Sequence, residues 1–304
     1  MNPRTHPTSP QPPFGRALCA MITPFTEDGS LDLDGAQRLA AQLVADGCDG
    51  LVLSGTTGES PTTTDTEKAK LIRAVRAAVG DTVPLIAGVG TADTGHTIDL
   101  ALSAAKAGAD GVLVVTPYYS KPPQDALEHH FREVADASPL PVMLYDIPGR
   151  TSTRIEPETM LRLAEHPGIV AVKDCSYDLL GTQKVLSRTE ALAYYAGCDE
   201  QILALYAVGA TGYVSTVANA APRQLRAILD AFDTGDTASA TRHQLRAMEL
   251  IELMMASGLP GTVTAKALLP TLGLPAGPLR PPLRPADRTT VDRLRAAYDR
   301  LTVD

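Results

Sequence analysis

The sequence predicts an α/β fold, a (β/α)8 TIM barrel followed by a C-terminal helical extension. Short runs rich in Val, Ile and Leu recur about every 20 to 35 residues, with segments of helical periodicity between them. These apolar runs do not alternate with polar residues, which is typical of parallel strands covered on both faces. About eight such units favour closure into a barrel, and a doubly wound open sheet is the second choice.

The strands are expected where Val, Ile and Leu cluster between Gly and Pro, which act as boundaries. In chain order they are 18–24, 50–55, 84–90, 111–117, 141–148, 169–175, 192–198 and 212–219. The segments between them carry helix signals. LDLDGAQRLAAQLVADG has apolar residues at i, i+3 and i+4 and ends at Gly47, and TADTGHTIDLALSAAKAG ends at Gly108.

No strand is expected after residue 219. The remaining apolar periodicity predicts helices at 222–232, 236–256, 264–272 and 286–301, with a proline-stiffened link, GPLRPPLRP, at 277–285. Five prolines precede Phe14, so residues 1–14 are expected to be a disordered tail. The chain therefore divides into this tail, a catalytic barrel at 15–232 and a helical region at 233–304.

Composition favours small solutes as ligands. The 304 residues carry a net charge of -8 with a pI near 5.3, and no basic run interrupts the acidic average, which argues against nucleic acid or an anionic membrane as a partner. No signal peptide or membrane span is evident. The four cysteines, Cys19, Cys48, Cys175 and Cys198, have no C-x-x-C spacing, so neither zinc nor a disulfide framework is expected, and a reducing cytoplasm fits best.

Reactive side chains are expected where the strands end, because TIM-barrel enzymes place catalysis at the carboxyl ends of their strands. These ends read SGTTGES, TPYYSKPP, YDIPGRT and VKDCS. In the last of them Lys173 follows four apolar residues, at a place where a dehydrated amine can have a lowered pKa. Tyr145 lies one strand earlier, with the hydroxyls of Thr56, Thr57 and Tyr119 and the cation Arg150 at other strand ends. A neutral lysine near a tyrosine proton shuttle is suited to imine formation with a carbonyl substrate.

Each of these features also has a purely structural interpretation. A lysine that ends a strand commonly reaches water, and Gly-Thr-Thr-Gly or Pro-Gly-Arg-Thr can be ordinary turns. Their combination is what favours catalysis.

The loops after the seventh and eighth strands, AGCDEQ and STVANAAP, lack the glycine-rich pattern of a phosphate site, so neither phosphorylated substrates nor pyridoxal phosphate is expected. His129 and His130 are adjacent, on different helix faces, and are expected to be solvated rather than metal ligands; no metal and no cofactor is predicted.

The motifs GTTGESPTTTD, VVTPYYSKPP, MLYDIPGRT and VAVKD together resemble those of the dihydrodipicolinate synthase and N-acetylneuraminate lyase superfamily of class I pyruvate aldolases. The resemblance runs from Gly15 to the C-terminus and is strongest to dihydrodipicolinate synthases of the actinobacterial type. It implies condensation of pyruvate with L-aspartate 4-semialdehyde to 4-hydroxy-tetrahydrodipicolinate, on the way to diaminopimelate and lysine. It also implies a homotetramer, a dimer of dimers.

The resemblance further implies a role for each site residue. Lys173 would form the Schiff base with pyruvate, and Tyr145 would relay protons through Thr56 to Tyr119, which would reach into a neighbouring subunit's site. The remaining residues would bind substrate: Thr57 the pyruvate carboxylate, Arg150 the carboxylate of the aldehyde, and Gly197 and Val214 the walls of the pyruvate pocket.

Some positions depart from the family pattern. Cys198 stands where an aspartate is common, and Tyr213 begins a stretch that is usually aliphatic; both are expected near the pocket mouth. They leave open an aldolase or dehydratase for 2-keto-3-deoxy sugar acids, and a catalytically silent paralogue acting as a scaffold.

At the lysine feedback site Ser60 and Tyr118 match, whereas the four other positions carry Asp65, Lys68, Ala92 and His96. A cation at Lys68 predicts insensitivity to lysine.

Overall fold

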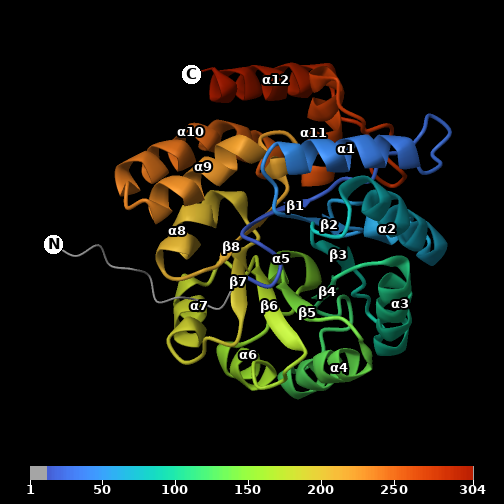
Figure 1. The fold of residues 1–304 in the computed structure, drawn as a ribbon, viewed down its shortest axis with the longest axis vertical. Coiled ribbons are helices and arrows are strands. Elements are labelled where there is room, and N and C mark those ends of the chain that lie inside the picture. The colour runs from blue at the N-terminus through green and yellow to red at the C-terminus, as the bar shows by residue number, and fades with distance from the viewer. Residues whose placement is uncertain (1–11, 304) are drawn as a thin grey trace.

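Eight parallel strands close into a barrel in chain order, as the computed structural model of residues 12–303 shows (Figure 1). Each strand pairs with its sequence neighbours, and β1 also pairs with β8. The predicted barrel is confirmed, and the doubly wound alternative is wrong. The strands are β1 Ala17–Ala20, β2 Gly50–Leu53, β3 Leu85–Gly88, β4 Gly111–Val115, β5 Val142–Asp146, β6 Ile169–Asp174, β7 Ala193–Ala196 and β8 Gly212–Ser215.

The strands are shorter than the apolar runs that predicted them, mostly at their carboxyl ends. β1 ends at Ala20 rather than at residue 24, and the stretch after β8 turns into the 3-10 helix η3, Val217–Asn219. Residues beyond the strand ends, such as Ile22 and Val217, are nevertheless fully buried. Hydrophobicity therefore continues into the loops above the barrel, where the ladder of backbone hydrogen bonds has already stopped.

Helices cover the outside of the barrel. Those that follow β1 to β7 are α1 Leu33–Ala45, α2 Asp65–Val79, α3 Thr94–Ala107, α4 Gln124–Ala137, α5 Pro148–Thr151, α6 Pro157–Leu163, α7 Leu179–Leu186 and α8 Ile202–Ala207. Their ends have chemical causes. Asp32 caps α1 by accepting from Gly35 N at 2.7 Å, Thr64 and Glu67 form a capping box at α2, and Gly108 ends α3 in the left-handed conformation.

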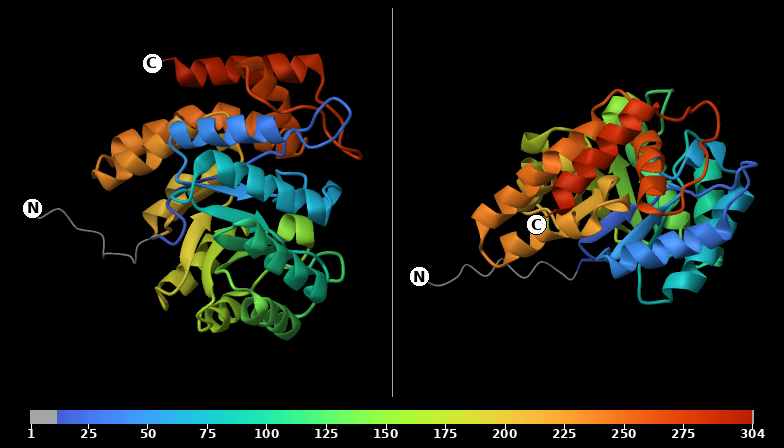
Figure 2. Two further views of the ribbon diagram at one scale, coloured as in Figure 1. Left: turned by 45° about the vertical axis from the view of Figure 1, so that its right-hand side comes forward. Right: turned by 90° about the horizontal axis from the view of Figure 1, so that it is seen from above.

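The C-terminal helices form a layer beside the barrel, next to α1, as the two orientations in Figure 2 show. They are α10 Thr237–Met255, α11 Gly261–Leu268 and α12 Arg288–Thr302. The helix that follows β8, α9 Pro222–Asp233, packs against β1 and α8 and completes the ring of helices around the barrel, with α10 on its other side. The helix expected at 264–272 begins earlier and becomes the 3-10 helix η4, Leu269–Leu272, where Pro270 has no N–H to continue an α-helix. Across residues 12–303, none of the helices combines the length and apolar character needed to cross a membrane.

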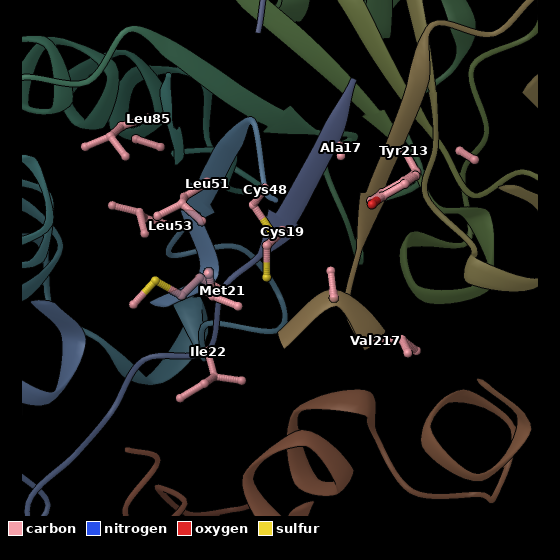
Figure 3. Packing of buried hydrophobic residues seen from close by; sticks show 14 of the residues in the cluster. Ala17, Cys19, Met21, Ile22, Cys48, Leu51, Leu53, Leu85, Tyr213 and Val217 are labelled. Carbon is pink, nitrogen blue, oxygen red and sulfur yellow. The ribbon is translucent and has the colours of Figure 1, made fainter. Parts of the chain in front are cut away.

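The apolar side chains form two separate cores. One fills the barrel interior and includes Leu18, Met143 and Val214. The other lies between the strands and the helices and includes Cys19, Cys48 and Tyr213 (Figure 3). Successive residues of a strand therefore contribute to different cores, so Val214 faces the interior and Tyr213 faces outward. The expectation that Tyr213 lies near the pocket mouth is wrong.

The burial of Phe14 and His130 contradicts two further expectations, that Phe14 ends a disordered tail and that His130 is solvated. Residues 1–11, most of the predicted disordered tail, lie outside the described residues, but Phe14 at its end is 1% exposed and packs in the interior core against β4 at Gly111. His130 is not solvated. It is 5% exposed, its Nδ1 lies 2.9 Å from the Thr94 hydroxyl, and burial lowers its pKa to about 4. His129 is exposed, as expected.

Candidate active site

Lys173 lies on the interior face of β6, close to its carboxyl end. Ala171 and Cys175, two residues before and after it, belong to the interior core, so the strand's alternation directs the Lys173 side chain inward as well. The residue is only 5% exposed. Parallel pairing places Lys173 beside Tyr145 of β5 and Tyr195 of β7, and its Nζ lies 4.5 Å from the centroid of the Tyr145 ring. An amine in this position is largely removed from water.

The Tyr145 hydroxyl shares the interior with this lysine. Burial raises the pKa of Tyr145 above its ordinary value of 10, and Cys175 adds to this increase. The nearby Arg150 guanidinium and a hydrogen bond with Thr56 act in the opposite direction. Tyr145 therefore remains protonated at neutral pH, with a hydroxyl partner beside it to which a proton can be passed.

The loop after β2, residues 54–60, carries both threonines and is called the threonine loop below. Its Thr57 is 7% exposed, and its Oγ1 lies 2.9 Å from Oγ1 of Thr216, just after β8. The Thr56 side chain is exposed and reaches Tyr145. The loop thus connects the ends of β2, β5 and β8 across the top of the barrel.

Gly197 brings bare backbone against Lys173. A Cβ atom at this position would lie 2.9 Å from Cγ of Lys173 and 3.0 Å from the Asp174 carbonyl oxygen, and it would overlap Sγ of Cys175. Only glycine fits without displacing these groups. Val214 belongs to the interior core on β8, the strand that pairs with β7. Lys173, Tyr145, Thr56, Thr57, Gly197 and Val214 are thus gathered at the carboxyl end of the barrel.

Two predicted site residues are less enclosed. Arg150 is exposed in the short helix α5, although it is near enough to affect the pKa of Tyr145. Tyr119 is 95% exposed with a φ of 74°, and its side chain makes no hydrogen bond to any residue in the described range 12–303. Within one chain, therefore, Tyr119 does not join the others.

Asp199 is a charged neighbour of Lys173 that the sequence interpretation missed. It is 1% exposed, its carboxylate accepts a hydrogen bond from Ser215, and burial raises its pKa to about 6, with Lys173 opposing that rise. The available signal was an acidic residue two positions after Gly197, at the end of a strand. No group of three or more His, Cys, Asp and Glu side chains within residues 12–303 is arranged to hold a metal ion.

Asp146 and Asp174 are opposite each other in the register of β5 and β6. Each directly follows a site residue, Tyr145 or Lys173, so its side chain points to the outer face of the barrel. The Asp146 side chain is 3% exposed, and this burial raises its pKa from the ordinary 3.8 to about 7. The carboxylates of Asp174 and Asp178 add to the increase. The Ile155 N–H, which donates to Asp146, and the nearby Arg154 oppose it. Well below pH 4 the carboxyl is protonated in the folded and unfolded states alike. As pH rises from 4 to 7 the unfolded chain ionises first, so stability falls, by at most about 4 kcal/mol above pH 7.

We therefore expect Asp146→Asn to raise the melting temperature at pH 8 and to leave it nearly unchanged at pH 4, because the amide keeps an acceptor for Ile155 N and carries no charge. Thermal unfolding followed by circular dichroism at both pH values measures this. Asp81→Asn, in an exposed loop, is the matched control. An equal shift at both pH values would show that Asp146 ionisation is not the cause.

A sequence model described as the Dihydrodipicolinate synthetase family matches residues 13–300. The chain belongs to this family. A curated relative, 4-hydroxy-tetrahydrodipicolinate synthase 1 of Streptomyces coelicolor, is 76% identical over 292 residues, covering 96% of this chain and 95% of the relative. The synthase of Acidothermus cellulolyticus is 57% identical over 283 residues, covering 93% and 91%. The predicted resemblance to actinobacterial members of the dihydrodipicolinate synthase family is confirmed.

Solved structures of the family have the same fold. The enzyme from Cyanidioschyzon merolae, with lysine bound, superposes with a TM-score of 0.92 at 38% identity, covering 95% of this chain and 98% of that one. The chloride-inhibited dihydrodipicolinate synthase of Acinetobacter baumannii, complexed with pyruvate, gives 0.90 at 31% identity, covering 96% and 100%. Both likenesses span nearly the whole chain, including the C-terminal helices.

Proposed function

We propose that this chain is a 4-hydroxy-tetrahydrodipicolinate synthase, a lyase that condenses pyruvate with L-aspartate 4-semialdehyde and so feeds diaminopimelate and lysine synthesis. The observation that carries the proposal is Lys173, buried on the barrel's interior face with its Nζ 4.5 Å from the Tyr145 ring, in a chain 76% identical to a curated enzyme of that name. Function resides in such a site rather than in the barrel itself, which hosts many chemistries.

In the proposed reaction the neutral Lys173 amine attacks C2 of pyruvate, and loss of water gives an imine. Tyr145 donates the proton that the departing oxygen needs and is then reprotonated through Thr56. The pyruvate methyl group then gives a proton to the relay of Tyr145 and Thr56, which leaves an enamine. The enamine carbon attacks the aldehyde carbon of the second substrate, and the same relay returns a proton to the aldehyde oxygen. The amine of the adduct then displaces Lys173 at the imine carbon, closing the ring and freeing the enzyme.

Substrate binding is assigned to groups around this amine. Thr57, fixed by Thr216, binds the pyruvate carboxylate together with backbone N–H groups of the threonine loop. Gly197 leaves room for pyruvate beside Lys173, and Val214 contacts its methyl group. Arg150, an exposed cation at the rim, binds the carboxylate of the aldehyde, because a guanidinium matches a carboxylate in charge and geometry.

Tyr119 supports an oligomeric enzyme. An almost fully exposed tyrosine held at a positive φ is costly for a monomer to keep, whereas a neighbouring subunit would give its hydroxyl a partner near Thr56. Tyr177, Leu179 and Leu180 form a second exposed apolar group. We propose a homotetramer, a dimer of dimers, and sedimentation of the purified chain measures it directly.

No cofactor is assigned to the reaction, because the protonated imine itself withdraws electrons from the reacting carbon. The proposed setting is the cytoplasm. All four cysteines are free thiols, each buried, as expected where the surroundings are reducing.

The proposal is tested by incubating the protein with pyruvate and borohydride and measuring the intact mass, then supplying aspartate semialdehyde or a sugar-derived aldehyde in a turnover assay. We expect a reduced pyruvate adduct on Lys173, and consumption of aspartate semialdehyde in preference to the sugar aldehyde. An adduct with the reverse preference would indicate a 2-keto-3-deoxy sugar acid enzyme. No adduct and no turnover would indicate a silent paralogue.

Free lysine is expected not to inhibit the enzyme. At the position of the family's lysine site the Lys68 ammonium is already present, donating to the carbonyl oxygens of Ser60 (3.0 Å) and Thr63 (2.5 Å), and burial lowers its pKa. His96 Nε2 lies 3.0 Å from Asp65 Oδ2, so that carboxylate is also engaged. A second ammonium entering this site would meet a cation.

Initial rates measured with and without saturating lysine should therefore differ by less than about twofold. The Cyanidioschyzon merolae enzyme, which has been solved with lysine bound, is the positive control for binding. Lysine binding to the present chain with similar affinity, by calorimetry, would contradict the prediction.

A further inference from the structure

A buried ion pair lies directly behind the threonine loop. Nζ of Lys266, on α11, is 2.6 Å from Oε1 of Glu59, in the loop, and the two side chains are 2% and 1% exposed. The pair joins the C-terminal helical layer to the loop that carries Thr56 and Thr57. Such a pair needs further polar contacts to offset the loss of hydration.

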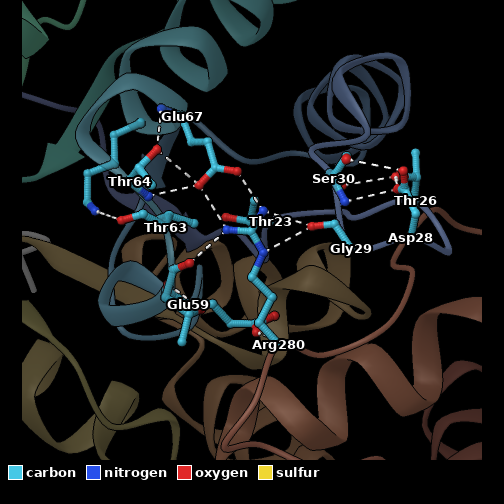
Figure 4. Close-up of polar contacts among 12 residues, drawn as sticks. Thr23, Thr26, Asp28, Gly29, Ser30, Glu59, Thr63, Thr64, Glu67 and Arg280 are labelled. Carbon is cyan, nitrogen blue, oxygen red and sulfur yellow. Dashed lines mark hydrogen bonds and ion pairs between the residues drawn. The ribbon is translucent and has the colours of Figure 1, made fainter.

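Those contacts surround both charges. Lys266 donates to the Pro278 carbonyl oxygen at 2.8 Å and lies 4.1 Å from the centroid of the Phe25 ring. The backbone N–H of Arg280 donates to Oε2 of Glu59 at 2.9 Å, and the Arg280 guanidinium lies 4.2 Å from the same ring. Glu59 is thus held by two segments of the C-terminal region, and Figure 4 shows it beside one of them, at Arg280.

Arg280 also binds segments that pack around the threonine loop. Its guanidinium donates to both carboxylate oxygens of Glu67 in the first turn of α2, at 2.6 and 2.8 Å, and lowers the pKa of Glu67 to about 2. It also donates to the carbonyl oxygens of Thr62 at 2.7 Å and Gly29 at 2.8 Å (Figure 4). These bonds fix where the loop passes into α2.

The backbone of the threonine loop needs such support. Glu59 has a φ of 56° and Ser54 one of 53°, in the left-handed region that residues other than glycine rarely adopt. Such conformations persist where the surroundings over-determine them. Thr262, also on α11, donates to the Thr56 carbonyl oxygen at 3.3 Å, and Thr23 donates to that of Gly58 at 2.7 Å. Contacts from outside the loop therefore hold both the Glu59 side chain and the backbone around Thr57.

We infer that Glu59, Lys266 and Arg280 are positioning residues, through which the C-terminal helical layer sets the placement of Thr56 and Thr57 for pyruvate binding and proton relay. None of the three is assigned a contact with substrate. The inference rests on the proposed function only for its kinetic consequence. The structural part of the inference, that the buried charges order residues 54–60, does not depend on the proposed function.

The test uses Lys266→Met, which leaves Glu59 buried without its cation, and the double variant Lys266→Met/Glu59→Gln, which removes both charges while keeping similar shapes. We expect Lys266→Met to raise the KM for pyruvate about tenfold or more, because Thr57 is displaced, and the double variant to recover most of that loss.

Arg300→Met is the control. It removes an exposed cation that is paired with Glu249 on the same helical layer, and it should leave the KM for pyruvate unchanged. If Lys266→Met does not fold, Glu59→Gln alone provides the measurement.

Hydrogen–deuterium exchange of residues 54–60 without substrate separates the two proposals. Faster exchange in Lys266→Met than in the double variant and in Arg300→Met supports the positioning role, even if the unmodified protein forms no pyruvate adduct and the proposed function fails. Unchanged exchange together with an unchanged KM would overturn the positioning role while leaving an active synthase intact.

Discussion

Replacing Lys173 with arginine is expected to reduce turnover by at least about a thousandfold and to abolish the borohydride-trapped pyruvate adduct. A guanidinium remains protonated at any pH the fold tolerates and cannot form the imine. The added bulk is also unfavourable, because Cγ of Lys173 already approaches the bare backbone of Gly197. Intact mass after trapping, combined with a turnover assay on aspartate semialdehyde, measures both consequences.

Lys184→Arg is the matched control, since Lys184 is an exposed lysine on α7, the helix that follows β6. It should behave as the unmodified protein does in both assays. Because arginine is also a long basic side chain but cannot lose its proton, loss of activity in Lys173→Arg isolates the need for an amine nitrogen that can become neutral. Undiminished turnover by Lys173→Arg would contradict covalent catalysis at this residue.

Replacing Gly197 with alanine is expected to cost about a hundredfold in kcat/KM for pyruvate. The added methyl group would overlap Sγ of Cys175 and lie 2.9 Å from Cγ of Lys173, so the lysine side chain must move. The rate of adduct formation in the trapping assay is the direct measurement, because it reports the placement of the amine before the aldehyde is involved.

A second substitution distinguishes displacement from loss of folding. Cys175→Ala in the Gly197→Ala background removes the overlapping sulfur and should recover part of the lost rate, although the contact with Lys173 remains. Gly95→Ala on α3 is the control, since its new Cβ would have only an ordinary contact of 3.4 Å with Asp93. A normal adduct rate in Gly197→Ala would show that the close approach has no effect on the amine.

The barrel itself could be predicted because each βα unit is locally encoded, by an apolar run, a cap and a glycine stop such as Gly108. Strand ends were harder to predict, since Ile22 and Val217 are as buried as the strand residues although they are outside the hydrogen-bonded ladder. The direction of Tyr213 depends on strand alternation, so it could be read only once the register of β8 was known.

The candidate site was predictable to the extent that strand ends meet at one edge of the barrel. Lys173 and Tyr145 are neighbours because β5 and β6 are paired in register. The burial of His130 and the proximity of Asp199 to Lys173 depend on packing between distant segments. The contact between Glu59 and Lys266 links residues more than two hundred positions apart and has no local sequence signal.

Closure of the barrel also affects the newly made chain. β1 pairs with both β2 and β8, so one of its edges lacks a hydrogen-bonding partner until residues 212–215 have been synthesised. At typical translation rates of about 5–20 residues per second, that interval is roughly 10 to 40 s. During it the nascent polypeptide exposes an unpaired apolar edge of the kind that associates with other chains, so ribosome-bound intermediates shorter than residue 215 are the species that chaperones would most need to shield.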